Sequence, residues 1–82
     1  MITVYAISSL QRSYIYVGMS SQLSKRIERH NKGQNKTTKT YTPFKLIYTK
    51  EFVNRKEARE HEKYLKSGVG REFLKSISKE KE

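Results

Sequence analysis

The amino-acid sequence predicts a small α/β protein of the α+β type, in which a three-stranded antiparallel sheet is flanked by helices. Ile2 to Ser8 and Tyr14 to Ser20 are rich in β-branched and aromatic residues, and the short polar segment between them is typical of a β-hairpin loop. Phe44 to Phe52 is a third run of this kind, with helical periodicity before and after it. At 82 residues, the chain has room for one modest core.

The first helix is predicted from Leu23 to Lys32. Ser21 precedes it as a plausible N-cap, and Gly33 lies near its end. Residues 33–42 are polar and show no apolar periodicity, so we expect a loop that Pro43 closes before the third strand begins.

Two more helices are predicted after the third strand. Asn54 followed by Glu57 resembles a capping box, and it opens a helix that runs to about Lys66, where Ser67 and Gly68 end it. Residues 71–77 are predicted to form another short helix. We therefore expect a single domain over residues 1–77 and a frayed tail over residues 78–82, which have no apolar anchor.

The composition favours a polyanionic partner. Eighteen Lys and Arg residues stand against eight Asp and Glu, which gives a formal charge of +10 and makes nucleic acid the leading partner class. The same charge is also consistent with a ribosome-associated domain or a protein-interaction domain. The absence of cysteine excludes disulfides and thiolate metal sites. The apolar residues come in short runs, so we expect no membrane span or signal peptide, and a cytoplasmic protein.

Strand periodicity brings two tyrosines together. Val4 and Ala6 share one face of the first strand, which leaves Tyr5 on the other face. In the second strand, the same alternation puts Tyr16 and Val17 on different faces. We expect Tyr5 and Tyr16 to meet on one side of the sheet. A cross-strand packing pair is the simpler explanation for two such residues.

The first helix turns two basic residues inward. Arg26 and His30 lie beside the apolar stripe that begins at Leu23, whereas Lys25 and Arg29 point away from it. Taken singly, the arginine could extend along the apolar surface and the histidine could be a structural hydrogen-bonding group.

Glu62 occupies an unexpected place in the second long helix. It lies between Ala58 and Leu65 on the stripe that should face the core. A carboxylate there is costly unless it is paired or bound to a metal. An ion pair with one of the basic residues is the alternative to a metal site.

In their order, these features resemble the GIY-YIG nuclease superfamily, especially its short stand-alone members and the incision domain of the excision-repair nuclease. The two family tripeptides appear as Thr3-Val4-Tyr5 and Tyr16-Val17-Gly18, followed by the Arg26 and His30 pair. The resemblance covers residues 2–75.

Further landmarks of the short members follow in the same order. They are matched by Thr38, the Pro-Phe-Lys-Leu-Ile-Tyr segment at 43–48, Glu57-Ala58 and Glu62-Lys63. The sequence departs from the family pattern where the first tripeptide lacks its glycine and where Phe44 stands in place of the usual tryptophan.

The resemblance implies a metal-dependent endonuclease that hydrolyses phosphodiester bonds. It places one Mg²⁺ or Mn²⁺ at Glu62 and the scissile phosphate at Arg26. It implies Tyr5 as the base and Tyr16 as a positioning group, with the reverse assignment left open, and His30 as a carrier of the tyrosine proton. Nucleic-acid contacts are expected from Lys25, Arg29, Lys36, Thr38 and Lys39.

The expected substrate is DNA more than RNA. So small a domain is expected to gain specificity from DNA structure, a homodimer mate or a DNA repair or recombination partner. A non-catalytic nucleic-acid-binding module that retains the fold is the alternative.

Overall fold

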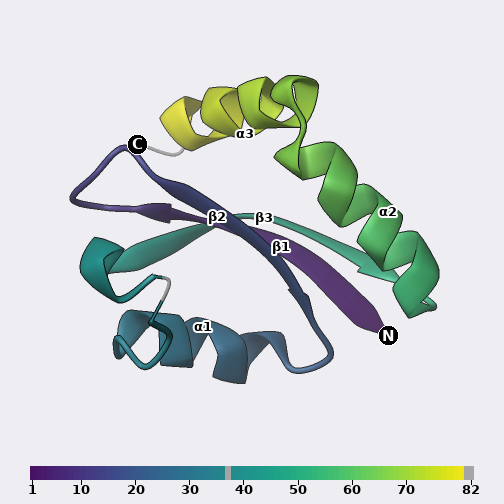
Figure 1. Ribbon diagram of the computed structural model, residues 1–82, viewed down its shortest axis with the longest axis horizontal. Helices are drawn as coiled ribbons and strands as arrows, with labels where there is room; N and C mark the ends of the chain where they lie inside the picture. The colour runs from purple at the N-terminus through teal and green to yellow at the C-terminus, as the bar shows by residue number, and fades with distance from the viewer. Residues whose placement is uncertain (37, 81–82) are drawn as a thin grey trace.

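A computed structural model of the protein describes residues 1–36 and 38–80. Within these residues the elements are β1 (Ile2–Ser9), β2 (Ile15–Ser20), α1 (Leu23–Asn31), a 3₁₀ turn (Lys39–Tyr41), β3 (Phe44–Phe52), α2 (Arg55–Lys66) and α3 (Gly68–Glu80). The three strands form one antiparallel sheet in the order β2-β1-β3. Helix α1 covers one face of the sheet, and α2 and α3 cover the other (Figure 1). The predicted fold class is confirmed.

The central strand β1 divides its side chains between the two faces because strand residues alternate. Val4 and Ala6 face α2 and α3, whereas Tyr5 and Ile7 face α1. Four consecutive residues of β1 are thus fully buried. This burial anchors Tyr5 at the middle of the molecule.

A separate apolar cluster lies on each face of the sheet. The larger one, beneath α2 and α3, is formed by Ile2, Val4, Ala6, Val17, Ile47, Ala58, Leu65 and Leu74. The smaller one, beneath α1, consists of Tyr5, Ile7 and Phe44, with Tyr14, Tyr16, Leu23, Ile27 and Tyr41 packed around it. The α1 face is therefore the one rich in tyrosine, with polar hydroxyls in its core.

The N-termini of the first two helices differ in capping. Asn54 caps α2 as predicted, and its Oδ1 accepts from the backbone N–H of Glu57 at 2.9 Å. The prediction of Ser21 as the α1 cap is wrong, because Gln22 occupies that position and makes no side-chain cap bond. Ser20 instead accepts from the N–H of Gln22 at 2.9 Å, which stabilises the turn before the helix.

Helix α3 is longer than predicted. It starts at Gly68, directly after the Ser67 that ends α2, and continues to Glu80. Ser78 is buried, and its hydroxyl donates to Ser8 Oγ at 3.2 Å, so this residue is anchored on β1 and does not begin a frayed tail. Residues 81 and 82 of the expected tail lie outside the described residues. None of the described helices combines the length and apolar character needed to cross a membrane.

Candidate active site

Tyr5 lies at the centre of the site. It is fully buried in β1 and pairs with Gly18 of β2. A methyl group at Gly18 would come within 2.8 Å of the Tyr5 hydroxyl oxygen and 3.0 Å of the Tyr16 ring. The glycine is therefore required for close approach, because the Tyr5 ring passes over the backbone of β2 where any side chain would obstruct it.

His30 holds the Tyr5 hydroxyl from the other side. It lies in the last turn of α1 and is fully buried, with Nε2 3.0 Å from the Tyr5 oxygen and Nδ1 2.8 Å from Thr38 Oγ1. A neutral imidazole has one donor nitrogen and one acceptor nitrogen. With Nε2 as the acceptor nitrogen, the Tyr5 O–H donates to it and Nδ1–H donates to Thr38 Oγ1.

Arg26, one helical turn before His30, completes the cluster. Interactions of its guanidinium with Tyr5 first, and with Tyr16, raise its pKa. Its Nε is buried and has no hydrogen-bond partner in the part of the chain that the structure describes. A buried donor in this condition costs about 1–3 kcal/mol, and such donors are uncommon outside functional sites. Arg26 and His30 thus face inward as predicted.

Tyr16 lies beside the same group of residues. Its ring centroid is 6.3 Å from that of Tyr5 and 4.8 Å from that of His30. The pair forms diagonally across the sheet, because Tyr5 is opposite Gly18 and Tyr16 is opposite Ile7. The predicted meeting of the two tyrosines is confirmed. Tyr16 remains partly exposed, whereas Tyr5 is fully buried.

The pKa shifts of Tyr5 and His30 both favour the neutral form of the side chain. Burial raises the pKa of Tyr5, and the hydrogen bond from Arg26 opposes this effect only in part. Burial also lowers the pKa of His30, and the positive charge of Arg26 adds to this effect. Because the pKa of the Tyr5 phenol is raised and that of the His30 imidazole is lowered, the hydroxyl proton stays on Tyr5. It moves to His30 only when another proton reaches the Tyr5 oxygen.

Glu62 lies on α2 and influences Tyr5 through its charge. Its side chain is only 20% exposed, and it lies 3.8 Å from Lys66 Nζ one turn further along the helix. After burial and Tyr16, its negative charge is a further influence that raises the pKa of Tyr5, so the carboxylate is electrostatically coupled to the tyrosine cluster. The ion pair considered as the alternative to a metal site is therefore present, but it is long and its lysine is half exposed.

The oxygen chemistry of this region fits a hard divalent cation. Glu62 offers one accessible carboxylate, and Mg²⁺ typically binds one or two protein carboxylates while water and phosphate complete its coordination. Over residues 1–36 and 38–80, no three His, Cys, Asp or Glu side chains are grouped closely enough to hold a metal.

The predicted nucleic-acid contacts divide into two groups. Lys25 and Arg29 are exposed on the outer face of α1, where they line a shallow hollow, and Lys36 and Lys39 are exposed on the following loop. Thr38 is fully buried against His30, so it cannot contact nucleic acid in this conformation, and that expectation is corrected. Its hydroxyl contacts the imidazole of His30, a contact that no periodicity in the loop could have indicated.

The amino-acid sequence matches a known family of catalytic domains. The model of the GIY-YIG catalytic domain matches residues 1–75, which include β1 to α2 and most of α3. The chain belongs to the GIY-YIG family. This domain is a nuclease domain, so the family implies nuclease activity on nucleic acid, and its members usually use a divalent metal.

Curated relatives of the chain include UPF0213 proteins of several bacteria. The chain is 38% identical over 65 residues to a UPF0213 protein of Clostridium perfringens, covering 78% of this chain and 70% of that protein. It is 37% identical over 65 residues to a UPF0213 protein of Staphylococcus saprophyticus, covering 78% of this chain and 79% of the other. These names state no activity. No solved structure matches the chain.

Proposed function

We propose that the protein is an endonuclease that hydrolyses phosphodiester bonds with one bound Mg²⁺ or Mn²⁺. Its substrate is DNA in preference to RNA. The observation that carries the proposal is the buried Tyr5–His30–Thr38 chain, in which Arg26 and Glu62 both influence the pKa of Tyr5. A purely structural core would not be expected to combine a buried imidazole, a buried guanidinium nitrogen without a described partner and a largely buried carboxylate.

Arg26 is proposed to hold the scissile phosphate. Its planar guanidinium keeps its charge at all working pH values and can contact two phosphate oxygens at once. The tyrosine hydroxyls fix its position from one side. A phosphate that approaches from the exposed edge of β2 would meet a cation that is already oriented.

Tyr5 is proposed to act as the base through proton exchange. As the attacking water gives a proton to the Tyr5 oxygen, the original hydroxyl proton passes to His30 Nε2 at 3.0 Å. The water oxygen bonds to phosphorus, the bond from phosphorus to O3′ breaks, and O3′ takes up a proton from solvent, which leaves a 5′-phosphate and a 3′-hydroxyl. This exchange avoids a free tyrosinate, which the raised pKa of Tyr5 disfavours.

Tyr16 and His30 support this step. Tyr16 is partly exposed and within hydrogen-bonding reach of Arg26, which suits it to orient the water or a phosphate oxygen. The lowered pKa of His30 favours loss of the acquired proton after the reaction. Glu62 would hold the divalent ion, whose chemistry is to neutralise charge that develops on the phosphate and the leaving oxygen.

Cleavage of a mixed substrate set tests the proposal. Labelled duplex, single-stranded and branched DNA and an RNA of the same sequence would be incubated with Mg²⁺, Mn²⁺ or EDTA. The proposal predicts products that carry 5′-phosphates, that require the metal and that form faster from DNA. Salt-sensitive binding without cleavage of any of these substrates would favour the non-catalytic binding module instead.

A further inference from the structure

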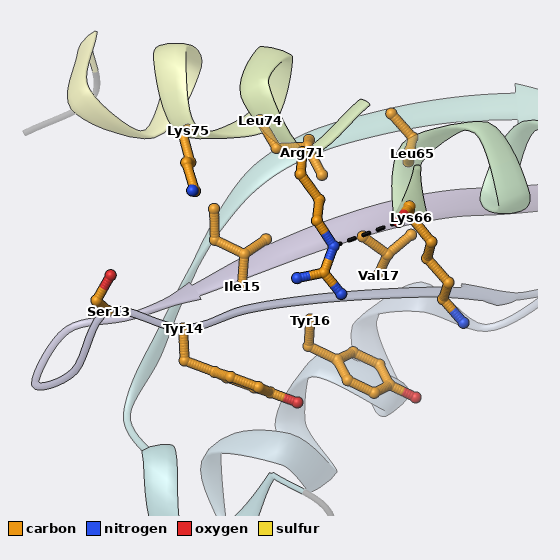
Figure 2. A pocket seen from close by; sticks show the side chains of 10 residues that line it. All are labelled: Ser13, Tyr14, Ile15, Tyr16, Val17, Leu65, Lys66, Arg71, Leu74 and Lys75. Atoms are coloured by element: carbon orange, nitrogen blue, oxygen red, sulfur yellow. Dashed lines mark hydrogen bonds between the residues drawn. The ribbon is translucent and has the colours of Figure 1, made fainter. Parts of the chain in front are cut away.

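A pocket beside the tyrosine cluster is not used by the proposed chemistry. It has a volume of about 450 Å³, within the usual range for small-ligand sites, and lies where α2 and α3 pass over the outer edge of β2 (Figure 2). Its described lining residues are Ser13, Tyr14, Ile15, Tyr16, Val17, Leu65, Lys66, Arg71, Leu74 and Lys75. Tyr16 belongs both to this pocket and to the proposed active site.

The charge on the pocket wall has one sign. Lys66, Arg71 and Lys75 reach from the two helices toward β2, and no acidic residue is among the described lining residues (Figure 2). Arg71 Nε donates to the Lys66 carbonyl at 3.3 Å, which fixes one side of the guanidinium and leaves its terminal nitrogens for a ligand. Clustered cations of this kind favour phosphate, which binds arginine through two oxygens.

Helix packing holds this cationic wall in place. A methyl group at Gly70 would lie 2.2 Å from the Tyr64 carbonyl oxygen and 2.5 Å from Leu65 Cα, so α3 can begin directly against α2 only because this residue is glycine. Arg71 is the next residue, and its backbone N–H donates to the Ser67 carbonyl at 2.9 Å. Its Cα position at the pocket is therefore set by backbone contacts.

The floor of the pocket differs in character from its rim. Ile15, Val17 and Leu74 are apolar, and Tyr14 and Tyr16 add aromatic rings on the α1 side of β2. Tyr14 is rigid because its ring is stacked on Tyr41 at a centroid distance of 3.9 Å. Apolar side chains on one side of the β2 edge, aromatic rings on the other side and a cationic rim match one nucleotide, with its base against the edge and its phosphate at the rim.

Lys66 links the pocket to Glu62. Its Nζ lies 3.8 Å from the Glu62 carboxylate while the side chain lines the pocket. Tyr16 forms a second link, because it bonds to Arg26 on the active-site side. A strand whose scissile phosphate lies at Arg26 therefore needs to extend only along the edge of β2 to bring its next nucleotide into the pocket.

We propose that this β2-edge pocket binds the nucleotide adjoining the scissile phosphate on the cleaved strand, with the base unstacked and the phosphate held by Arg71 and Lys75. The inference rests on the proposed function for the position of the scissile bond. Because a paired and stacked base cannot lie on the pocket floor, the subsite favours substrates whose nucleotide at this position is unpaired.

Binding measurements test the subsite independently of cleavage. All proteins would carry Glu62→Gln, and the affinity for a fluorescent single-stranded oligonucleotide would be measured over a range of salt. We expect Arg71→Gln and Lys75→Gln each to weaken binding about tenfold and to reduce the salt slope by about 0.7, as for one lost phosphate contact. Lys56→Gln, an exposed residue outside the pocket, is the charge-matched control and should change affinity less than about twofold.

Photo-crosslinking then locates the base. An oligonucleotide carrying a single 5-iodouracil is scanned through each position, and we expect a crosslink to Tyr14 or Tyr16 from one position only, lost in Arg71→Gln. Crosslinks elsewhere, or pocket variants that bind like Lys56→Gln, would overturn the subsite even if the wild-type protein cuts. If the wild type cuts nothing but the pocket variants weaken binding and the crosslink forms, the nucleotide subsite stands and the hydrolytic proposal fails.

Discussion

The hydroxyl oxygen of Tyr5 lies 3.0 Å from Nε2 of His30, 25 residues further along the chain, in a fully buried contact. This contact joins the central strand to the end of α1. It brings Tyr5, whose pKa is raised, next to His30, whose pKa is lowered. A proton can move between them only when another group supplies or removes one. The expected effects of changing Tyr5 or Gly18, and of protonating His30, depend on this contact.

Tyr5→Phe is expected to lower kcat about 10²- to 10⁴-fold, because it removes the hydroxyl through which the water proton would pass to His30. Tyr16→Phe should have a smaller effect, since it removes a positioning group. The matched control is Tyr48→Phe, which breaks a second tyrosine–histidine contact of 2.7 Å, to His61 on the other face of the sheet. Single-turnover cleavage with saturating protein measures all three.

Equal losses in Tyr5→Phe and Tyr48→Phe would contradict the assignment, because the effect would then reflect a general loss of packing. A larger loss in Tyr16→Phe than in Tyr5→Phe would exchange the roles of the two tyrosines.

Gly18→Ala is expected to destabilise the fold by about 1–3 kcal/mol and to abolish most cleavage. Its new methyl group would meet the Tyr5 hydroxyl at 2.8 Å, and the buried ring has no free space into which to move. Gly68→Ala is the control, since nothing lies within 4 Å of its added methyl group, and it should leave stability unchanged or raise it by up to about 1 kcal/mol. Urea unfolding measures both effects, and similar midpoints for the two variants would refute the close-approach explanation.

Acid should weaken both the fold and the activity through His30. Its pKa in the folded protein is below the ordinary 6.5, so the unfolded chain takes up a proton first as the pH falls through 6.5. The free energy of unfolding therefore decreases from pH 6.5 downward until the folded imidazole is also protonated, and above pH 6.5 this contribution is constant. The kcat/KM profile should lose activity over the same acidic window, because a protonated His30 cannot accept the Tyr5 proton.

Two variants separate the histidines in this pH experiment. His61 also has a lowered pKa, from burial and the charge of Lys50, so it contributes to the acid loss of stability in the same direction. His30→Gln should remove the acidic limb of the activity profile, whereas His61→Gln should retain it. An unchanged limb in His30→Gln would exclude His30 from the proton exchange.

Arg26→Lys should lower kcat about 10²- to 10³-fold even though it preserves the charge. A lysine ammonium cannot contact two phosphate oxygens in the plane of a guanidinium while also bonding to both tyrosine hydroxyls. Arg59→Lys, an exposed position on α2, is the control and should behave as wild type. Activity of Arg26→Lys within a few-fold of wild type would show that a point charge is sufficient at this position.

Much of the sheet and of the inward-facing residues could be predicted because each depends on a local period. The two-residue period of strands predicted that Tyr5 and Val4 lie on different faces of the sheet. The helical period predicted that His30 faces inward, and it marked Glu62 as unusual for a core stripe. The α2 cap at Asn54 was also predictable, because its partner Glu57 is only three residues away.

Features that depend on contacts between distant segments could not be predicted in this way. Thr38 was expected on the nucleic-acid surface, but its burial depends on how the loop returns over His30. The full length of α3 depends partly on Ser78 meeting Ser8, 70 residues away. The β2-edge pocket requires two helices and a strand, and the close packing at Gly70 that orients Arg71 has no signature in local sequence.

The most direct test of the central claim compares Glu62→Gln with Glu60→Gln, an exposed acid two residues earlier on α2. Single-turnover cleavage would be measured against Mg²⁺ and Mn²⁺ concentration, with binding of uncut substrate measured in EDTA. The account predicts that Glu62→Gln loses metal-dependent cleavage about 10²-fold or more while its substrate binding stays close to that of Glu60→Gln, which cleaves like wild type. Cleavage by Glu62→Gln at the wild-type rate and with the same metal dependence would contradict the claim that this carboxylate holds the catalytic ion.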